Sequence, residues 1–261
     1  MLCQTITSTK NPVIAKARSL SDSIQRRETR TFLLDGEHMV SEALAVCPQL
    51  VQALFVVESC AARYENLLQS VHAETRIFPV SDQAMAALSQ VKTPQGIAAI
   101  CGMPTLTALE RFSGRIVLLE NVQDPGNVGT VLRTVDAAGF QGVILTHGCA
   151  DPYSPKALRA TMGSIFRVPI CMNVAADEAL KTLHNCGFIS VGASLSGHPY
   201  YERGAMQKNL CLLIGNEGAG LLPQTQAQCT HLYRLPMRGG AESLNAAVAA
   251  AVFMYDLMNR D

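Results

Sequence analysis

A helix with no polar face, close to the end of the chain, limits the possible folds most strongly. Residues 246–255 (AAVAAAVFMY) are apolar on every side, so other parts of the protein must cover this helix. Ten apolar residues are too few to span a bilayer. An apolar strand at 232–235 and a loop with Gly239 and Gly240 precede the helix, which we expect to open at Glu242-Ser243. The sequence therefore predicts a core or subunit-interface helix, preceded by a fixed glycine loop that suits a closely approaching ligand.

Short apolar strands alternate with helical segments in the first part of the chain. We expect strands at residues 32–34, 51–57, 76–80 and 96–101, and helices at 37–46, 58–71 and 81–90. This order is typical of an α/β sandwich. The pattern breaks between residues 102 and 114, which predicts a smaller domain at 1–104 and a second domain at 105–261.

The second part also alternates, and three of its strands end in loops rich in glycine or asparagine. Strands are expected at 116–120, 142–146, 188–193, 210–214 and 232–235. One helix is expected to follow the loop 121–127 and end at Ala138, and two more are expected at 155–162 and 175–186. The three loops are residues 121–127, 215–220 and 236–245. In a parallel α/β sheet such loops share the carboxyl edge, where ligands bind. We therefore expect the three loops to form one site.

Composition excludes several classes of protein. The chain is 48% hydrophobic and 16% charged, which is enough for a full core without disordered blocks. Its nine cysteines contain no C-x-x-C pair and fit reduced thiols in a cytoplasmic protein. No H-E-x-x-H pattern is present, so we expect no metal site. The N-terminus lacks an apolar region, so we expect no secretion signal and no membrane span.

The formal net charge is zero, but the first 30 residues carry an excess of four positive charges. Six cations oppose only Asp22 and Glu28. A solvated amphipathic helix and a phosphate-facing patch both explain this excess. The cations are Lys10, Lys16, Arg18, Arg26, Arg27 and Arg30.

The glycine loops do not match the common phosphate-binding motifs. There is no G-x-x-x-x-G-K-[ST], and Gly215-x-x-Gly218-x-Gly220 reverses the spacing of the dinucleotide fingerprint. Ser243 has no G-x-S-x-G context, which argues against a serine hydrolase. Amides and a few charges around glycines instead suit a polar organic ligand.

The polar residues of the three loops each have a structural alternative. Asn127 is suited to capping the helix that follows it, and Arg133 to pairing with Asp136 at i+3. Glu217 is suited to bonding the backbone of a tight turn, and Ser243 to serving only as an N-cap. From residue types and spacing alone, the chain is an α/β protein with a polar site.

The three loops, taken together, resemble the three motifs of the SpoU/TrmH RNA 2′-O-methyltransferases, a branch of the SPOUT class. Asn121-x-x-x-Pro125-x-Asn127-x-Gly129-x-x-x-Arg133-Thr134 is similar to the first motif, and Gly215-Asn-Glu217-Gly218-x-Gly220-Leu221 to the second. Pro236-Met237-x-Gly239 with Ser243-Leu244-Asn245 is similar to the third. Residues 1–101 resemble the ribosomal-protein-like substrate-binding domain that often precedes the catalytic domain.

This resemblance implies S-adenosylmethionine as the methyl donor, an RNA substrate, a parallel sheet with a deep C-terminal trefoil knot, and a homodimer formed through the C-terminal domain. It implies that the cofactor lies against Gly215, Asn216, Leu235, Met237 and Leu244. The RNA, ribosomal or transfer, would be bound partly by the basic N-terminal segment. The nucleotide that is modified does not follow from the sequence.

The same resemblance implies roles for five residues in ribose methylation. Arg133 would orient and stabilise the attacking 2′-oxygen, because a guanidinium is a poor base. Asn127 would hold Arg133 or the ribose, Glu217 and Ser243 would fix the loop and the arginine, and Asn245 would brace the third loop. Two alternatives remain open: a catalytically silent RNA-binding or ribosome-assembly protein on the same fold, and a small-molecule enzyme of ordinary doubly wound type.

Overall fold

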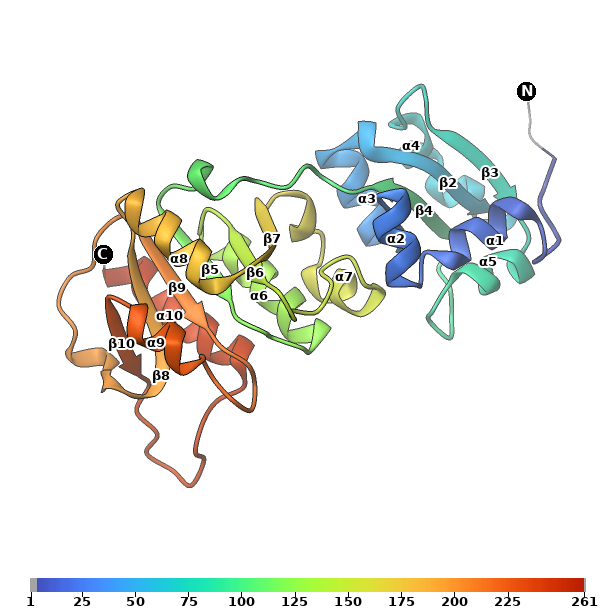
Figure 1. The fold of residues 1–261 in the computed structure, drawn as a ribbon. Coiled ribbons are helices and arrows are strands. Elements are labelled where there is room, and N and C mark those ends of the chain that lie inside the picture. Colours follow the sequence, from blue (N-terminus) through green and yellow to red (C-terminus); the bar gives the residue numbers. More distant parts are fainter. Residues whose placement is uncertain (1–3, 261) are drawn as a thin grey trace. The chain divides into compact units, whose positions relative to one another are not determined.

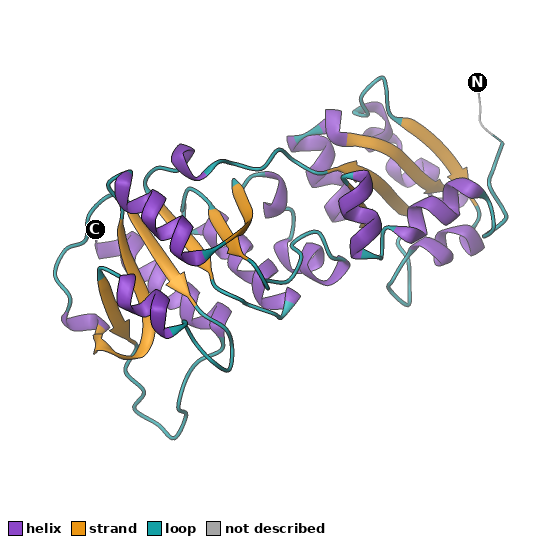
Figure 2. Ribbon diagram, viewed as in Figure 1, coloured by secondary structure: helices purple, strands orange, loops and turns teal. Residues whose placement is uncertain are grey.

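The computed structural model describes residues 4–260, which divide into two compact units. The N-terminal unit contains the residues up to Thr105 together with Tyr153–Phe166, and the C-terminal unit contains Leu106–Pro152 and the residues from Arg167 onward. Figures 1 and 2 show that each unit has its own sheet with helices against it. Each unit is described below by itself.

The N-terminal unit is built on a four-stranded mixed sheet with the order β1-β4-β2-β3. β4 is antiparallel to both of its neighbours, whereas β2 and β3 are parallel. The strands are β1 (Thr31–Asp35), β2 (Val51–Val57), β3 (Arg76–Val80) and β4 (Ile97–Gly102). The helices are α1 (Pro12–Ser19), α2 (Ser23–Thr29), α3 (Glu37–Val46), α4 (Glu65–Gln69), α5 (Asp82–Leu88) and α7 (Pro155–Thr161), with 3₁₀ segments at Pro48–Leu50, Glu58–Tyr64 and Ser164–Phe166. The helix expected at 58–71 is therefore a 3₁₀ segment followed by the short helix α4.

Helix α1 is part of the core of this unit rather than a surface attachment. Ile14, Ala17 and Leu20 are fully buried and pack with residues of β2 and α5 such as Phe55 and Met85. Asn11 caps the helix, because its side chain accepts a hydrogen bond from the Val13 N–H at 2.9 Å. The basic segment is thus attached to the sheet by its apolar face.

Residues 153–166 join the N-terminal unit although they follow strand β6 (Val143–Thr146) of the other unit in sequence. The ring of Tyr153 lies 5.0 Å from that of Phe32 in β1, and the ring of Phe166 lies 6.3 Å from it. The Met162 carbonyl is 3.2 Å from His38 Nε2. This segment therefore belongs to the packing of the first sheet.

The C-terminal unit contains a six-stranded sheet, β10-β8-β9-β5-β6-β7, in which all neighbouring strands are parallel. Its strands are β5 (Arg115–Leu119), β6 (Val143–Thr146), β7 (Ile170–Val174), β8 (Ile189–Pro199), β9 (Leu210–Ile214) and β10 (His231–Arg234). Its helices are α6 (Pro125–Ala137), α8 (Ala176–Asn185), α9 (Pro223–Gln228) and α10 (Ala246–Arg260), with 3₁₀ segments at Leu109–Arg111 and Tyr200–Glu202. The parallel α/β arrangement expected from the sequence is confirmed, and β7 is an additional strand.

The last helix begins later than expected and is covered on one face only. It starts at Ala246 rather than at Glu242, because the Asn245 side chain accepts hydrogen bonds from the N–H groups of Ala247 and Val248 at 2.9 and 3.3 Å. Its buried face packs against α6 and β9. Three apolar side chains of the other face are exposed in the single chain: Val248, Tyr255 and Met258. Among residues 4–260, no helix combines the length and apolar character needed to cross a membrane.

Candidate cofactor-binding and catalytic site

Three loops at the carboxyl edge of the C-terminal sheet form the candidate site. They follow β5, β9 and β10, whose order in the sheet is β10-β8-β9-β5. Because neighbouring strands are parallel, their carboxyl ends lie at one edge. Each loop leads into a helix, namely α6, α9 or α10.

Hydrogen bonds between side chains connect the three loops directly. Asn127 Nδ2 donates to Glu217 Oε1 at 2.8 Å, and Asn245 Nδ2 donates to Asn127 Oδ1 at 3.0 Å. The Glu217 carboxylate also accepts from the backbone N–H groups of Gln123 and Asp124, at 3.3 and 3.2 Å. Residues that are about 90 and 118 positions apart in sequence are thereby brought together, as the sequence analysis expected.

Glu217 supplies a carboxylate to this network, and the hydrogen bonds that it accepts favour its ionised form. Burial raises the pKa of its carboxyl group, but the hydrogen bonds from Asn127 and from three backbone N–H groups lower it more, so the net pKa lies below the ordinary value. A carboxylate that only accepts hydrogen bonds matches these donors. The negative charge therefore fixes the second loop against the first.

The second loop is a tight turn that is closed by its own backbone. Asn216 N–H donates to the Gly220 carbonyl at 3.0 Å, and Gly220 N–H donates to the Asn216 carbonyl at 2.9 Å. The Asn216 side chain accepts from the N–H groups of Gly218 and Ala219 and donates to the Asn121 carbonyl at 2.9 Å. Both the oxygen and the nitrogen of the Asn216 side-chain amide therefore stabilise the turn.

Gly215 occupies a position where no larger residue fits. A Cβ atom there would lie 2.1 Å from the Gly220 carbonyl carbon and 2.2 Å from the Leu221 nitrogen. Both are backbone atoms, so no side-chain rotation relieves the contact. Gly215 is thus required for close approach of two backbone segments.

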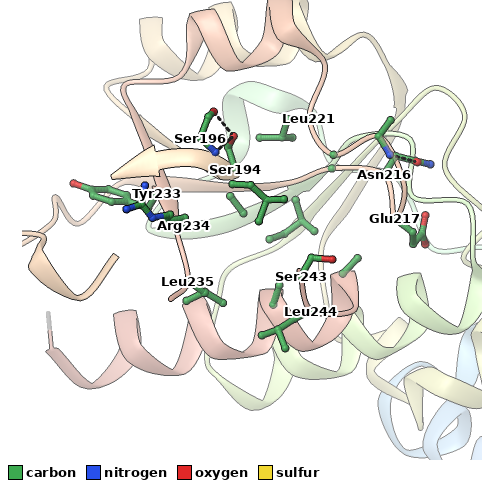
Figure 3. Close-up of a pocket in the computed structure, with 18 of the residues that line it drawn as sticks. Ser194, Ser196, Asn216, Glu217, Leu221, Tyr233, Arg234, Leu235, Ser243 and Leu244 are labelled. Atoms are coloured by element: carbon green, nitrogen blue, oxygen red, sulfur yellow. Dashed lines mark hydrogen bonds between the residues drawn. The ribbon is translucent and has the colours of Figure 1, made fainter. Parts of the chain in front are cut away.

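A cavity of about 370 Å³ lies between the second and third loops and residues of β8, and the first loop contributes no residue to its lining (Figure 3). All five residues expected to contact the cofactor line it: Gly215, Asn216, Leu235, Met237 and Leu244. Glu217 and Ser243 line it as well. Its volume lies in the range of small-molecule sites, and its walls combine apolar side chains such as Phe253 with convergent polar groups. These residues fit S-adenosylmethionine, which has a polar adenosine, a charged amino-acid end and an apolar thioether chain.

Arg133 lies apart from this cavity within one chain. It is exposed on α6 and is not among the residues that line the cavity, and it forms no hydrogen bond or ion pair with any of residues 4–260. The alternative pairing with Asp136 is wrong, because Asp136 instead accepts from Arg167 Nε at 2.8 Å. The guanidinium is therefore available to another partner.

The structure also decides the alternatives for Asn127 and Ser243. Asp124, rather than Asn127, caps α6, since its side chain accepts from the Asn127 N–H at 3.0 Å. The Asn127 side chain is consequently used in the loop network. Ser243 is not the N-cap of α10, and its exposed side chain has no hydrogen-bond partner within the described residues. It is directed to the cavity side of the third loop (Figure 3).

One of the six basic residues in the N-terminal segment does not fit an RNA-contacting role. The side chain of Arg26 is only 3% exposed, and its Nη1 donates to the carbonyls of Leu20 and Ser21, both at 2.8 Å. Arg26 therefore stabilises the turn between α1 and α2, and including it in the phosphate-facing patch was wrong. The other five are exposed: Lys10, Lys16, Arg18, Arg27 and Arg30.

Four polar residues next to the cavity were not expected from the sequence. Ser194, Ser196 and Gln226 line it, and Glu120 is a buried acid at the end of β5 that accepts from Leu222 N–H at 2.8 Å. A carboxylate directly after an apolar strand was a visible signal for Glu120. Nothing in the local sequence distinguishes the other three. Within residues 4–260, no group of three His, Cys, Asp or Glu side chains is placed to hold a metal ion.

Comparison with known proteins agrees with this site. The SpoU rRNA Methylase family matches residues 114–255, and the MRM3-like substrate binding domain matches residues 11–99. The chain is 35% identical over 258 residues to the Bacillus subtilis protein named 23S rRNA (guanosine(2553)-2'-O)-methyltransferase RlmP. The alignment covers 97% of this chain and 98% of the relative.

Solved structures that contain the cofactor have the same fold. The AdoMet-bound rRNA methyltransferase from Sinorhizobium meliloti has a TM-score of 0.88 and 30% identity, covering 97% of each chain. The SpoU methyltransferase AviRb from Streptomyces viridochromogenes, in complex with AdoMet, has a TM-score of 0.84 and 27% identity, covering 96% of this chain and 98% of that one. The resemblance seen in the three motifs is confirmed, and the chain belongs to the SpoU rRNA Methylase family of RNA 2′-O-methyltransferases.

Proposed function

We propose that this protein transfers the methyl group of S-adenosylmethionine to a ribose 2′-hydroxyl of ribosomal RNA or, as the second choice, transfer RNA. The observation that carries the proposal is the Asn127–Glu217–Asn245 network beside a cavity that suits the cofactor. Relatives named as 23S rRNA methyltransferases favour ribosomal RNA. The fold of the family further leads us to expect a deep trefoil knot in the C-terminal unit.

The chemistry requires an electrophilic methyl group, which the bound sulfonium supplies, and an activated sugar oxygen. The three-loop network holds the cavity walls so that the oxygen approaches in line, and such positioning contributes much of the rate. Arg133 stabilises the negative charge that develops on the 2′-oxygen as its proton leaves. Because guanidinium is always protonated, the proton passes to water or to an RNA phosphate rather than to Arg133.

A second copy of the chain would complete this site. Arg133 is exposed and does not line the cavity of its own chain. The exposed apolar face of α10, formed by Val248, Tyr255 and Met258, is suited to burial against another subunit. In the proposed homodimer, Arg133 of one subunit serves the cavity of the other.

The N-terminal unit would bind the RNA around the target nucleotide. Its five exposed cations on and around α1 and α2 supply phosphate contacts, and single-stranded or looped RNA is where a nucleotide is most accessible.

All eight cysteines in the described part of the chain are free thiols. Free thiols throughout that part support the proposed cytoplasmic location.

Transfer from labelled S-adenosylmethionine to purified ribosomal and transfer RNA tests this proposal. Digestion to nucleosides should place the label on ribose, with the ribosomal fraction preferred. Label on a base would refute the proposed reaction. RNA binding without any transfer, under conditions where the cofactor binds, would identify the silent RNA-binding protein instead.

A further inference from the structure

Three polar side chains form a connected cluster on one wall of the cavity, away from the three-loop network. Ser194 Oγ donates to Gln226 Oε1 at 2.9 Å, and Ser196 Oγ lies 2.9 Å from Ser194 Oγ and 3.4 Å from Gln226 Oε1. Figure 3 shows the two serines across the cavity from Leu235 and Leu244. The serines come from the middle of β8, and the glutamine comes from α9.

A buried carboxylate holds the helix that carries Gln226. Glu120 is 3% exposed, and its two oxygens accept from the Leu222 N–H at 2.8 Å and from Thr225 Oγ1 at 2.5 Å. Thr225 is itself only 1% exposed. Because Leu222 is the N-cap of α9 and Thr225 directly precedes Gln226, Glu120 fixes the position at which Gln226 enters the cavity.

The hydrogen bonds also fix the orientation of the Gln226 amide. Gln226 Nε2 donates to the Leu221 carbonyl at 2.8 Å, so Oε1 faces the serines. The amide nitrogen has a second N–H, and the hydroxyl oxygens have further lone pairs. The cluster therefore offers one donor and neighbouring acceptors to a ligand, and it carries no charge.

This combination matches the adenosine half of the cofactor better than the amino-acid half. The adenine edge presents a donor next to an acceptor, and each ribose hydroxyl does both. The ammonium and carboxylate of the methionine half instead favour charged partners. An uncharged donor–acceptor cluster thus selects for the nucleoside.

We propose that Gln226, together with Ser194 and Ser196, contacts the adenosine half of the cofactor through its side chain and sets selectivity for it, and that Glu120 is the positioning residue for Gln226. The inference rests on the proposed use of S-adenosylmethionine. The binding tests of Gln226 and the serines need no RNA, so their failure is distinguishable from a failure of RNA methylation.

The test compares two ligands by calorimetry on the full chain. S-Adenosylhomocysteine contains both halves of the cofactor, whereas 5′-methylthioadenosine lacks the amino-acid group. Gln226→Met keeps the size of the side chain but removes both polar groups. We expect it to weaken both ligands by a similar factor of about ten, since a hydrogen bond contributes modestly to affinity. Weakening of S-adenosylhomocysteine alone, or of neither ligand, would overturn the proposal.

Matched variants separate binding from folding. Gln224→Met, on the exposed part of the same helix, should leave both affinities unchanged. Ser196→Ala removes an exposed hydroxyl and should weaken both ligands several-fold even if Gln226→Met is unstable. Equal affinities in wild type and Ser196→Ala, together with an unstable Gln226→Met, would overturn the proposal.

An inosine analogue distinguishes the base edge from the ribose. S-Inosylhomocysteine replaces the exocyclic amine with a carbonyl oxygen. If the cluster contacts the base, the wild type prefers adenine and Gln226→Met loses that preference. If the cluster contacts the ribose, the ratio of the affinities for S-adenosylhomocysteine and S-inosylhomocysteine is the same in both proteins. Gln226→Met then binds both ligands more weakly than the wild type does. In either case adenosine recognition is supported, and an unchanged affinity for every ligand contradicts it.

The role of Glu120 has its own readout. Glu120→Gln keeps one acceptor and should raise KM for the cofactor several-fold while leaving kcat at saturating cofactor unchanged. Glu120→Ala should raise KM further. A fall in kcat with an unchanged KM in Glu120→Gln would refute positioning through Gln226.

Discussion

Gly215→Ala tests the cavity with the smallest possible change. The added Cβ would lie 2.1 Å from the Gly220 carbonyl carbon, whereas ordinary contacts begin at 3.4 Å. The backbone of one segment must therefore move by about 1.3 Å, because the Gly220 carbonyl carbon is a backbone atom that no side-chain rotation can displace. Gly215 does not need a left-handed backbone conformation, so the expected effect comes from the collision alone.

The displacement sets the expected magnitude. Moving groups in an active site by about 1 Å can cost about 100-fold in activity, and overpacking typically destabilises a fold by about 1–3 kcal/mol. We therefore expect Gly215→Ala to fold, with a lower melting temperature, and to lose about 100-fold in affinity for S-adenosylhomocysteine. Both walls of the cavity that meet at residues 215 and 220 contribute to that loss.

Calorimetry and thermal unfolding of Gly215→Ala and Gly204→Ala give a matched comparison. A Cβ at Gly204 would meet nothing within 4 Å, and Gly204 is outside the cavity lining. Gly204→Ala should behave like the wild type in both measurements. Cofactor affinity within twofold of wild type in Gly215→Ala would show that the close approach of the two segments does not shape the site.

Three further changes address the other parts of the site. Arg133→Ala should reduce methyl transfer at least 100-fold, about 3 kcal/mol in the barrier, and leave S-adenosylhomocysteine affinity within twofold; full turnover would refute its role. Replacing Lys16, Arg18 and Arg27 by glutamine should weaken RNA binding and reduce its salt slope by about two, without changing cofactor affinity; an unchanged slope would remove this surface from the account. The lowered pKa of Glu217 means that its stabilising contribution is complete above its ordinary value of 4.5 and is lost as the pH falls through the lowered value. Unfolding measured against pH should show an acid-dependent loss that is smaller in Glu217→Gln, and identical profiles would contradict the network.

The basic segment shows why charge substitution is preferable to deletion. From the sequence, removing residues 1–30 is a natural test of RNA binding. In the structure, Ile14, Ala17 and Leu20 are part of the core of the N-terminal unit, so deletion would disturb the fold as well as the charge. The exposed cations can be changed without touching that core.

Local sequence patterns predicted the strands and the three loops, because buried parallel strands are continuous apolar runs with defined turn residues. The residues of β5 and β9 illustrate this, since nearly all are buried. Strand β7 was missed because Ile170–Val174 is not a continuous buried apolar run: only Ile170 and Cys171 are buried, and Asn173 is exposed. The start of α10 was displaced because Asn245, which ends one motif, is also the helix cap.

Contacts between distant residues were beyond the sequence patterns. The burial of Arg26 depends on two carbonyls at the α1–α2 turn, and its neighbour Arg27 has the same charge but is exposed. Gln226 differs from Gln224 only in the face of α9 on which it lies. The family motifs supplied Asn127, Glu217 and Asn245, but the bonds that join them required the folded chain.

Mapping of ribose methylation in cells with and without this protein tests the central claim most directly. Mass spectrometry of the ribosomal and transfer RNA should show at least one 2′-O-methyl group that is absent without the protein and restored by the wild type, but not by Arg133→Ala. Identical ribose methylation in both RNA pools, with the protein present and able to bind S-adenosylhomocysteine, would contradict the account.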